Sequence, residues 1–172
     1  MSANCVHADS RCRPGREAHL RPAASADAPA IHALVDSIFR EYNLRLVLDG
    51  PDAHLREPSE YFRSRGGEFW VLERAGEIVG TVGAALRDDE SAELKSLYIH
   101  PSIRNLGWGA RLTTLVMDFA RRAGKRRLIL WSDTRFSDAH RLYRRLGFVQ
   151  SGVRELHDAY QSREYGFIFN LD

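Results

Sequence analysis

Two glycines and an arginine stand close together in the run Arg104-Asn105-Leu106-Gly107-Trp108-Gly109-Ala110, between an apolar segment and an amphipathic one. The first N–H groups of a helix have no internal partner and lie at the positive end of the helix dipole, so they can face an anion. Glycines at these positions let backbone N–H groups approach phosphate oxygens closely and permit unusual dihedrals. The run therefore predicts a phosphate-binding turn that opens a helix.

The spacing separates this run from two better-known phosphate loops. A dinucleotide fingerprint needs a third glycine, and Leu112 occupies that place. A P-loop needs Gly-Lys followed by Ser or Thr, which is absent here. Taken alone, the run is also compatible with an ordinary turn into a helix.

The elements that must position this turn follow from hydrophobic periodicity and breaker residues. Ser25 or Asp27 is expected to cap the first helix, and a loop is expected over Asn43–Pro58 with a short helix over 57–64. Gly124 and Gly147 are expected to end the two later helices. Strands are expected at 18–23, 68–74, 78–86, 93–99, 127–131, 148–153 and 165–170.

This order, an antiparallel meander that leads into a β-α-β crossover, predicts an α/β (α+β) fold. We expect a mixed, mostly antiparallel central sheet of six or seven strands with helices on both faces. The segment 127–131 is expected to be a buried parallel strand. Length and composition predict one domain over 18–172, preceded by a flexible polar tail over 1–17.

Composition narrows the classes of function. Lys and Arg number 25 against 23 Asp and Glu, a balance that does not favour nucleic-acid binding. Cys5 and Cys12 lie in the tail, so no core cysteine can carry an acyl group, and a reducing compartment is indicated. No apolar run approaches the roughly 20 residues of a membrane span, and no signal peptide is evident, so we expect a cytoplasmic protein without a membrane partner.

Basic residues gather at the end of the helix that follows the glycine run and continue beyond it. They fit either a helix end that complements the dipole or an attraction for a phosphorylated ligand. The group comprises Arg121, Arg122, Lys125, Arg126, Arg127, Arg135, Arg141, Arg144 and Arg145.

Two motifs at matching separation resemble the GNAT N-acetyltransferase family. Arg104, Gly107 and Gly109 match its acetyl-CoA pyrophosphate loop, R/Q-x-x-G-x-G/A. The family's later motif, A-x-x-L-Y-x-x-L-G-F, is matched by Ala139, Leu142, Tyr143, Leu146, Gly147 and Phe148. The weaker pattern of 18–86 is similar to the rest of that fold, so the resemblance covers about 150 residues.

The resemblance implies a set of coenzyme contacts. The backbone of Leu97, Tyr98 and Ile99 would face the pantetheine arm, and the N–H groups from Asn105 to Ala110, which include Leu106 and Trp108, would hold the pyrophosphate. Phe136 stands where many members have an asparagine near pantetheine, so one hydrogen bond to the coenzyme is in doubt. Asn105 replaces a frequent second basic residue, which would leave Arg104 as the main cation.

The implied chemistry is attack of a neutral amine on a thioester, by direct transfer and without a metal. Tyr143 matches a tyrosine that can protonate the leaving thiolate, and it would otherwise complete an apolar helix stripe. Glu93 matches a general base of some members, and it would otherwise pair with Lys95 or an arginine. His140, in the same helix as Tyr143, is expected to be exposed.

The expected activity is acetyl transfer from acetyl-CoA to a primary amine of a small molecule, amino acid or peptide. The loops 43–58 and 156–163 are expected to meet the acceptor, and their mixed charges do not decide its class. Two other hypotheses stay open: a non-catalytic acyl-CoA-binding regulatory module, and a nucleic-acid-binding module built on the arginines, although no nucleic-acid partner is expected. A homodimer is compatible with this interpretation, and the sequence leaves the acyl-chain preference open.

Overall fold

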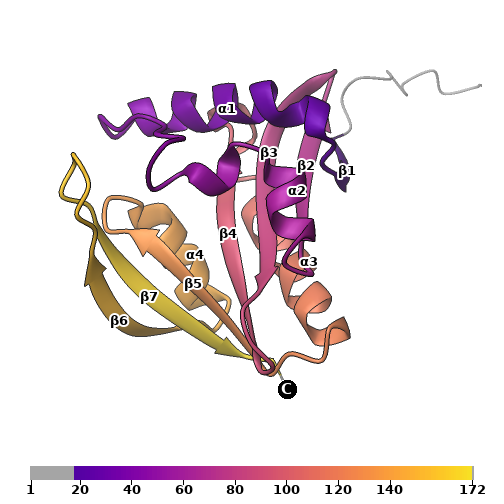
Figure 1. Ribbon diagram of the computed structural model, residues 1–172, viewed down its shortest axis with the longest axis vertical. Coiled ribbons are helices and arrows are strands. Elements are labelled where there is room, and N and C mark those ends of the chain that lie inside the picture. Colours follow the sequence, from indigo (N-terminus) through magenta and orange to yellow (C-terminus); the bar gives the residue numbers. More distant parts are fainter. Residues whose placement is uncertain (1–17, 172) are drawn as a thin grey trace, which may run out of the picture.

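The computed structural model describes residues 18–171, in which seven strands form one sheet in the order β1-β2-β3-β4-β5-β7-β6 (Figure 1). The strands are β1 His19–Pro22, β2 Glu68–Arg74, β3 Glu77–Leu86, β4 Ser91–Ile99, β5 Arg127–Asp133, β6 Val149–Glu155 and β7 Arg163–Asn170. All neighbours are antiparallel except β4 and β5. The predicted mixed, mostly antiparallel sheet is confirmed, whereas the tail 1–17 with its cysteines lies outside the described residues.

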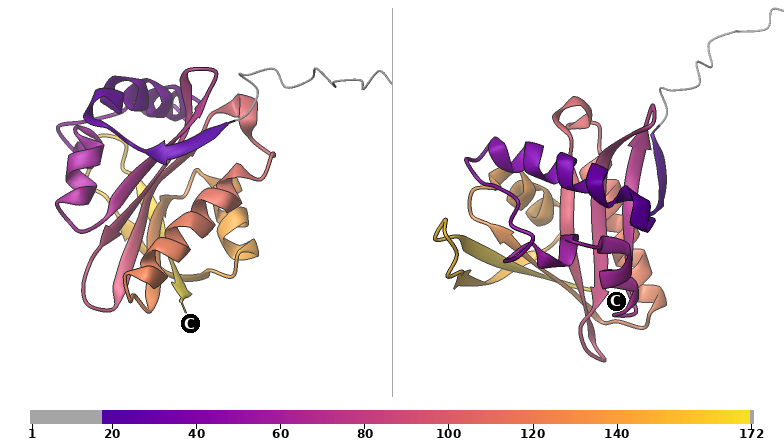
Figure 2. Two further views of the ribbon diagram at one scale, coloured as in Figure 1. Left: turned by 90° about the vertical axis from the view of Figure 1, so that its right-hand side faces the viewer. Right: turned by 45° about the horizontal axis from the view of Figure 1, so that its top comes forward.

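Helices cover both faces of this sheet (Figure 2). One face carries α1 (Ala28–Arg40) and α2 (Pro58–Arg63), which bury Ile31, Val35 and Phe62 against β2 and β3. The other face carries α3 (Trp108–Arg122) and α4 (Ser137–Arg145), whose apolar sides pack on the central strands. Strand alternation explains the two layers, since successive side chains of β2 point to opposite faces. Within residues 18–171, no helix is both long and apolar enough to cross a membrane.

The parallel pair β4–β5 is short. Ladder partners run only from Ser91–Arg127 to Leu94–Leu130, and beyond them the two strands diverge (Figure 1). β4 also carries a bulge, because Thr81 pairs with Tyr98 but Gly83 pairs with Lys95. At the bulge Ser96 has φ +55°, and its carbonyl accepts a hydrogen bond from Thr81 Oγ1 at 2.8 Å. The divergence leaves the second half of β4 without a strand partner on the β5 side.

Glycines end both helices of the crossover, as predicted. Gly124 has φ +71° after α3 and Gly147 has φ +94° after α4, the left-handed conformation in which a side chain is strained. Several strand ends differ from expectation by one or two residues, and one loop contains a short element that was not expected. β4 begins at Ser91 rather than at Glu93, and the loop 43–58 contains a 3₁₀ turn, Ala53–Leu55, that buries Leu55 completely.

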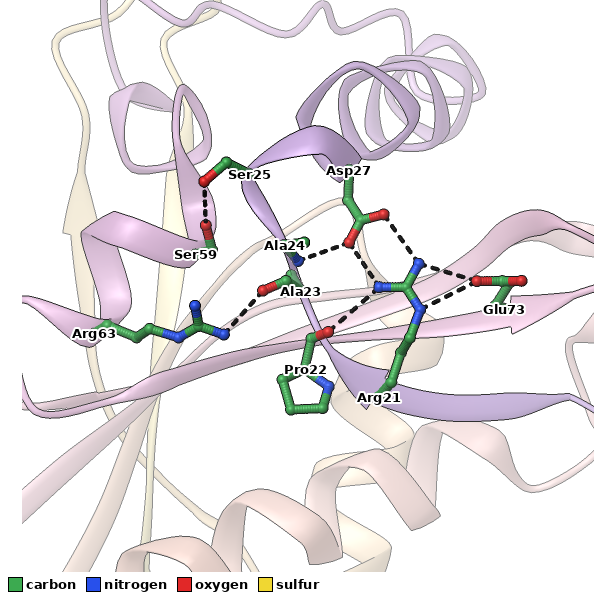
Figure 3. Close-up of polar contacts among 9 residues, drawn as sticks. All are labelled: Arg21, Pro22, Ala23, Ala24, Ser25, Asp27, Ser59, Arg63 and Glu73. Carbon is green, nitrogen blue, oxygen red and sulfur yellow. Dashed lines mark hydrogen bonds and ion pairs between the residues drawn. The ribbon is translucent and has the colours of Figure 1, made fainter.

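The first helix does not use a side-chain cap, contrary to expectation. Asp27 occupies the N-cap position, but its carboxylate accepts hydrogen bonds from Arg21 at 2.7 and 3.0 Å and from the Ala24 N–H at 2.8 Å (Figure 3). The Arg21 guanidinium also binds Glu73 on β2 at 2.9 Å. This cluster ties β1, the entry to α1, and β2 together. It forms because the edge strand β1 brings the guanidinium between two carboxylates, and the hydrogen bond from Arg21 holds the pKa of Asp27 below its usual value.

Candidate functional site

A cavity of about 570 Å³ opens where β4 and β5 diverge. It extends through the sheet from the face that α1 covers to the face that α3 and α4 cover, and it is lined by residues of both strands and of all three helices. Leu97, Tyr98 and Ile99 line it from the unpaired half of β4. A strand without its neighbour presents free backbone N–H and C=O groups, so this edge can pair with an extended ligand.

The predicted phosphate turn forms the end of the cavity at α3. Gly107 is the N-cap of α3 with φ +82° and ψ 0°, and Asn105 is also left-handed, with φ +62°. The first backbone bond of α3 runs from the Arg111 N–H to the Gly107 carbonyl at 3.1 Å. The N–H groups of the three residues between them therefore have no helical partner, and Trp108, Gly109 and Ala110 all line the cavity.

The two glycines of the turn are required for different physical reasons. A Cβ added at Gly107 would meet nothing within 4 Å, so this position needs glycine for its left-handed backbone. A Cβ added at Gly109 would lie 2.9 Å from Leu142 Cδ2, so this glycine lets α3 pack closely on α4. Leu106 does not line the cavity, since its side chain points outward and is 63% exposed. A role for its N–H group stays a prediction.

Arg104 lines the cavity, but its guanidinium is already engaged. It donates to both oxygens of Glu41 at 2.7 Å each, and its Nε donates to the Ile99 carbonyl at 3.0 Å. The hydrogen bond from Arg104 lowers the pKa of the Glu41 carboxyl. Because this carboxylate neutralises Arg104, the unpaired backbone N–H groups of the turn supply the positive potential that faces the cavity. Glu41 lies 63 residues from Arg104 in the sequence, so this ion pair could not be predicted from the local motif.

The remaining basic residues divide into two sets. Arg141 and Arg145 of α4 line the cavity, and Arg141 pairs with Asp138. The cluster at the end of α3 does not line it: Arg121 pairs with Asp118, and Arg127 pairs with Glu90. The helix-end interpretation therefore suits that cluster, and only Arg141 and Arg145 are placed to attract a phosphorylated ligand into the cavity.

Tyr143 lies on α4 with its ring packed between Phe148 and Phe167, at centroid distances of 5.7 and 5.6 Å. The residue is only 4% exposed, yet it lines the cavity. No fully buried side-chain oxygen within 18–171 lacks a hydrogen-bond partner, and the Tyr143 hydroxyl bonds to no described residue, so this hydroxyl is accessible in a residue that lines the cavity. Burial raises its pKa above the ordinary value for tyrosine, so the phenol keeps its proton at neutral pH.

Glu93 also lines the cavity, with 5% exposure. Its oxygens face two cations: Lys95 Nζ lies 3.4 Å from Oε1, and Arg87 Nε lies 3.3 Å from Oε2. The pairing with Lys95 that the sequence left open is therefore present. An ionised carboxylate beside the cavity can accept a proton directly or through water.

Two aromatic residues of the site have surroundings that the sequence did not indicate. Phe136 lines the cavity and packs edge-on against Tyr42 of the α1 end, with centroids 4.8 Å apart. Tyr98 packs edge-on against Phe39 at 5.5 Å, and burial, followed by the charge of Asp52, raises the pKa of its hydroxyl above the ordinary value. Tyr98 thus contributes a side chain to the α1 side of the cavity as well as backbone groups.

His140 is not exposed, contrary to expectation. It is 3% exposed between α4 and the sheet, and its Nε2 lies 3.2 Å from Ser132 Oγ. Its ring packs edge-on against Tyr165 and at a tilt against Phe167. Burial lowers its pKa, so the ring stays neutral. The burial of His140 could have been predicted from the sequence, because positions 140 and 143 lie three residues apart on one helical face.

The two loops expected to meet the acceptor do meet the cavity, but only some of their charges face it. Asp52 and His54 line it from the first loop, whereas Asp49 and Arg56 do not. Asp158 and Tyr160 line it from the second loop. His54 Nε2 lies 2.8 Å from Ser96 Oγ at the β4 bulge, and burial lowers the pKa of this histidine to about 3. That bond ties the first loop to β4. Among residues 18–171, no group of three His, Cys, Asp or Glu side chains is arranged to hold a metal ion.

Comparison with known proteins decides the family. The model of the acetyltransferase (GNAT) family matches residues 32–148, which include Glu93, the phosphate turn and Tyr143. The chain belongs to this family. It is 33% identical over 134 residues to the uncharacterized N-acetyltransferase YjgM of Escherichia coli, covering 75% of this chain and 80% of that one.

Two further comparisons extend this result. The aminoalkylphosphonate N-acetyltransferase of Salmonella typhimurium is 28% identical over 141 residues, which cover 78% of this acetyltransferase and 87% of the relative. The solved structure of yncA, a putative acetyltransferase of Salmonella typhimurium with acetyl-CoA, has a TM-score of 0.68 at 21% identity and covers 90% of this chain and 94% of that one. This likeness shows that the two proteins share the GNAT fold.

Proposed function

We propose that this acetyltransferase transfers the acetyl group of acetyl-CoA directly to a primary amine. The observation that carries the proposal is the convergence of three features on one cavity: the free N–H groups at the start of α3, the unpaired edge of β4, and the Tyr143 hydroxyl. The first suits a pyrophosphate and the second an extended pantetheine arm. The Tyr143 hydroxyl can donate a proton to the leaving thiolate.

The residues that would handle the reaction have separate tasks. The amine nitrogen attacks the thioester carbonyl carbon, a C–N bond forms, and the C–S bond breaks with its electron pair on sulfur. Tyr143 donates its proton to that sulfur and is reprotonated from solvent. Glu93 takes the proton that the amine must lose, directly or through water. Direct transfer is favoured because none of the described residues that line the cavity is a cysteine that could carry an acyl group.

The experiment is acetyl-CoA with a panel of amines, followed by release of free thiol. We expect release that depends on the acceptor. The panel should include an aminoalkylphosphonate, because the Salmonella relative is named for this class of acceptor. Binding of acetyl-CoA without release for any amine would instead favour a non-catalytic acyl-CoA-binding module, and absence of binding would overturn the proposal.

The role of Glu93 has its own prediction. Glu93→Gln keeps the size of the side chain but cannot accept a proton, so turnover should fall by about 100-fold at neutral pH. Raising the pH deprotonates the amine in solution, so activity should recover there. The pH profile of turnover checks this, and a wild-type profile in the variant would remove Glu93 from the mechanism.

A further inference from the structure

The charges that line the cavity differ between its two faces. On the side of α3 and α4 it is lined by arginines, of which Arg145 forms no ion pair with a described residue, and by the free N–H groups of the turn. On the side that α1 covers it is lined by the carboxylates of Asp52 and Asp158, with Glu164 of β7 beside them. A coenzyme with phosphates suits the first side, so the second side is left for the acceptor.

Most charged groups near the acceptor side neutralise one another. Glu164 Oε2 lies 2.5 Å from Arg154 Nε, and Glu93 pairs with both Lys95 and Arg87. Arg45, which also lines the cavity, lies 3.8 Å from Asp36. Asp52 and Asp158 form no ion pair with any of the described cations, and of these two carboxylates only Asp52 is buried. Asp52 is therefore the unbalanced buried charge on this side.

The surroundings of Asp52 leave one of its oxygens for a ligand. The residue is 9% exposed, and Oδ2 accepts a hydrogen bond from the Val47 N–H at 2.9 Å. Oδ1 accepts none from a described residue, and since no fully buried side-chain oxygen in 18–171 is unsatisfied, Oδ1 is accessible in a residue that lines the cavity. Burial raises the pKa of this carboxyl, and the charges of Asp158 and Glu164 raise it further, against the lowering effects of the Val47 N–H bond and of Lys95.

We propose that the acceptor is a diamine, whose non-reacting ammonium group binds Asp52 while its other nitrogen is acetylated. This inference rests on the proposed function and assigns its substrate class. A buried carboxylate without a cation is costly, and an ammonium group at hydrogen-bond distance would offset that cost with a charge-assisted bond.

The chemistry of the amine explains why two nitrogens are required. An ammonium group held by a carboxylate is stabilised in its protonated form and cannot attack a thioester. The nitrogen bound at Asp52 is therefore the one that does not react. The transfer itself makes the C–N bond and breaks the C–S bond at the other nitrogen, and the held ammonium group keeps its charge and its protons throughout.

The same charges disfavour an acceptor that carries a carboxylate. Its anion would meet Asp52 and Asp158, while Lys95 and Arg154 are already paired with Glu93 and Glu164. Like charges brought together in a partly buried site repel. Selection should therefore depend on the charge at the far end of the acceptor and only weakly on its apolar length.

The test uses three amines with the same five-carbon chain: cadaverine, pentylamine and aminovalerate. They end in an ammonium group, a methyl group and a carboxylate, respectively. In the thiol-release assay on the wild-type protein, we expect kcat/KM for cadaverine to exceed that for pentylamine by about tenfold or more, the value of one charge-assisted hydrogen bond, and aminovalerate to be the poorest. Equal or better turnover of aminovalerate would overturn the proposal, and this comparison needs no variant.

Asp52→Asn removes the charge and keeps an oxygen that can accept from the Val47 N–H. It should lower kcat/KM for cadaverine about tenfold and leave pentylamine and the KM for acetyl-CoA unchanged. Asp49→Asn is the matched control, because Asp49 lies in the same loop, is 94% exposed and does not line the cavity. An equal loss for cadaverine and pentylamine would mean a structural role and overturn the assignment. If none of the amines tested gave thiol release, the proposed function itself would be wrong. Thiol release that shows no preference for cadaverine would defeat only this inference.

Discussion

Replacing Tyr143 with phenylalanine is expected to lower kcat by about 100-fold, since a positioned general acid contributes on that order or more. The ring contacts with Phe148 and Phe167 remain in the variant, so the free energy of unfolding and the affinity for acetyl-CoA should stay unchanged. The physical reason is burial. Partial burial of a thiolate raises its pKa, so the thiolate takes up a proton more readily, and Tyr143 lines the same cavity and keeps its proton until that step.

Steady-state kinetics and a titration with acetyl-CoA check this result. Tyr61→Phe is a suitable control, because Tyr61 lies on α2 and does not line the cavity. Both variants should unfold at the same urea concentration as the wild type. Turnover that is unchanged in Tyr143→Phe would reduce this residue to an aromatic of the core and leave the thiolate to be protonated by water or by another group.

The second large effect is expected at the phosphate turn. Gly107→Ala places a Cβ on a backbone at φ +82°, which costs about 1 kcal/mol even though nothing obstructs the methyl group. The chain can relieve that strain by rotating the turn, which redirects the Trp108 N–H. The dissociation constant for acetyl-CoA should therefore rise by about tenfold or more, since a hydrogen bond to a charged phosphate is lost.

Gly124→Ala provides a matched control at the other end of the same helix. Gly124 has φ +71°, a Cβ there also meets nothing within 4 Å, and the residue does not line the cavity. Urea unfolding should show that both variants lose about 1 kcal/mol of stability. Calorimetric titration should show that only Gly107→Ala loses affinity. Equal affinities in the two variants would mean that the turn does not hold the pyrophosphate.

Features with a local cause could be predicted from the sequence. The glycines after α3 and α4, the α3 turn and the strand segments depend on neighbouring residues, and each of these was found at or close to its expected place. The fold class followed from the order of elements and from the two family motifs. Even the error at His140 concerned local information, because its spacing from Tyr143 already placed both on one face.

Features that depend on distant residues could not be predicted. The Arg104–Glu41 pair joins residues 63 apart, and the His54–Ser96 bond joins residues 42 apart. The charges of the loop 43–58 appeared balanced, and only the tertiary arrangement turns Asp52 inward while Asp49 faces solvent. The expected side-chain cap of α1 is absent for a similar reason, since Arg21 on the edge strand binds the carboxylate of Asp27.

The central claim is that backbone N–H groups at the start of α3 hold the pyrophosphate of the coenzyme. Calorimetric titration of the wild-type protein with acetyl-CoA and with S-acetylpantetheine, which lacks the pyrophosphate and the nucleotide, tests it most directly. We expect acetyl-CoA to bind at least about 100-fold more tightly, since several charge-assisted hydrogen bonds are at stake, and its advantage over S-acetylpantetheine to shrink in Gly107→Ala but not in Gly124→Ala. Equal affinity for the two ligands would contradict the account.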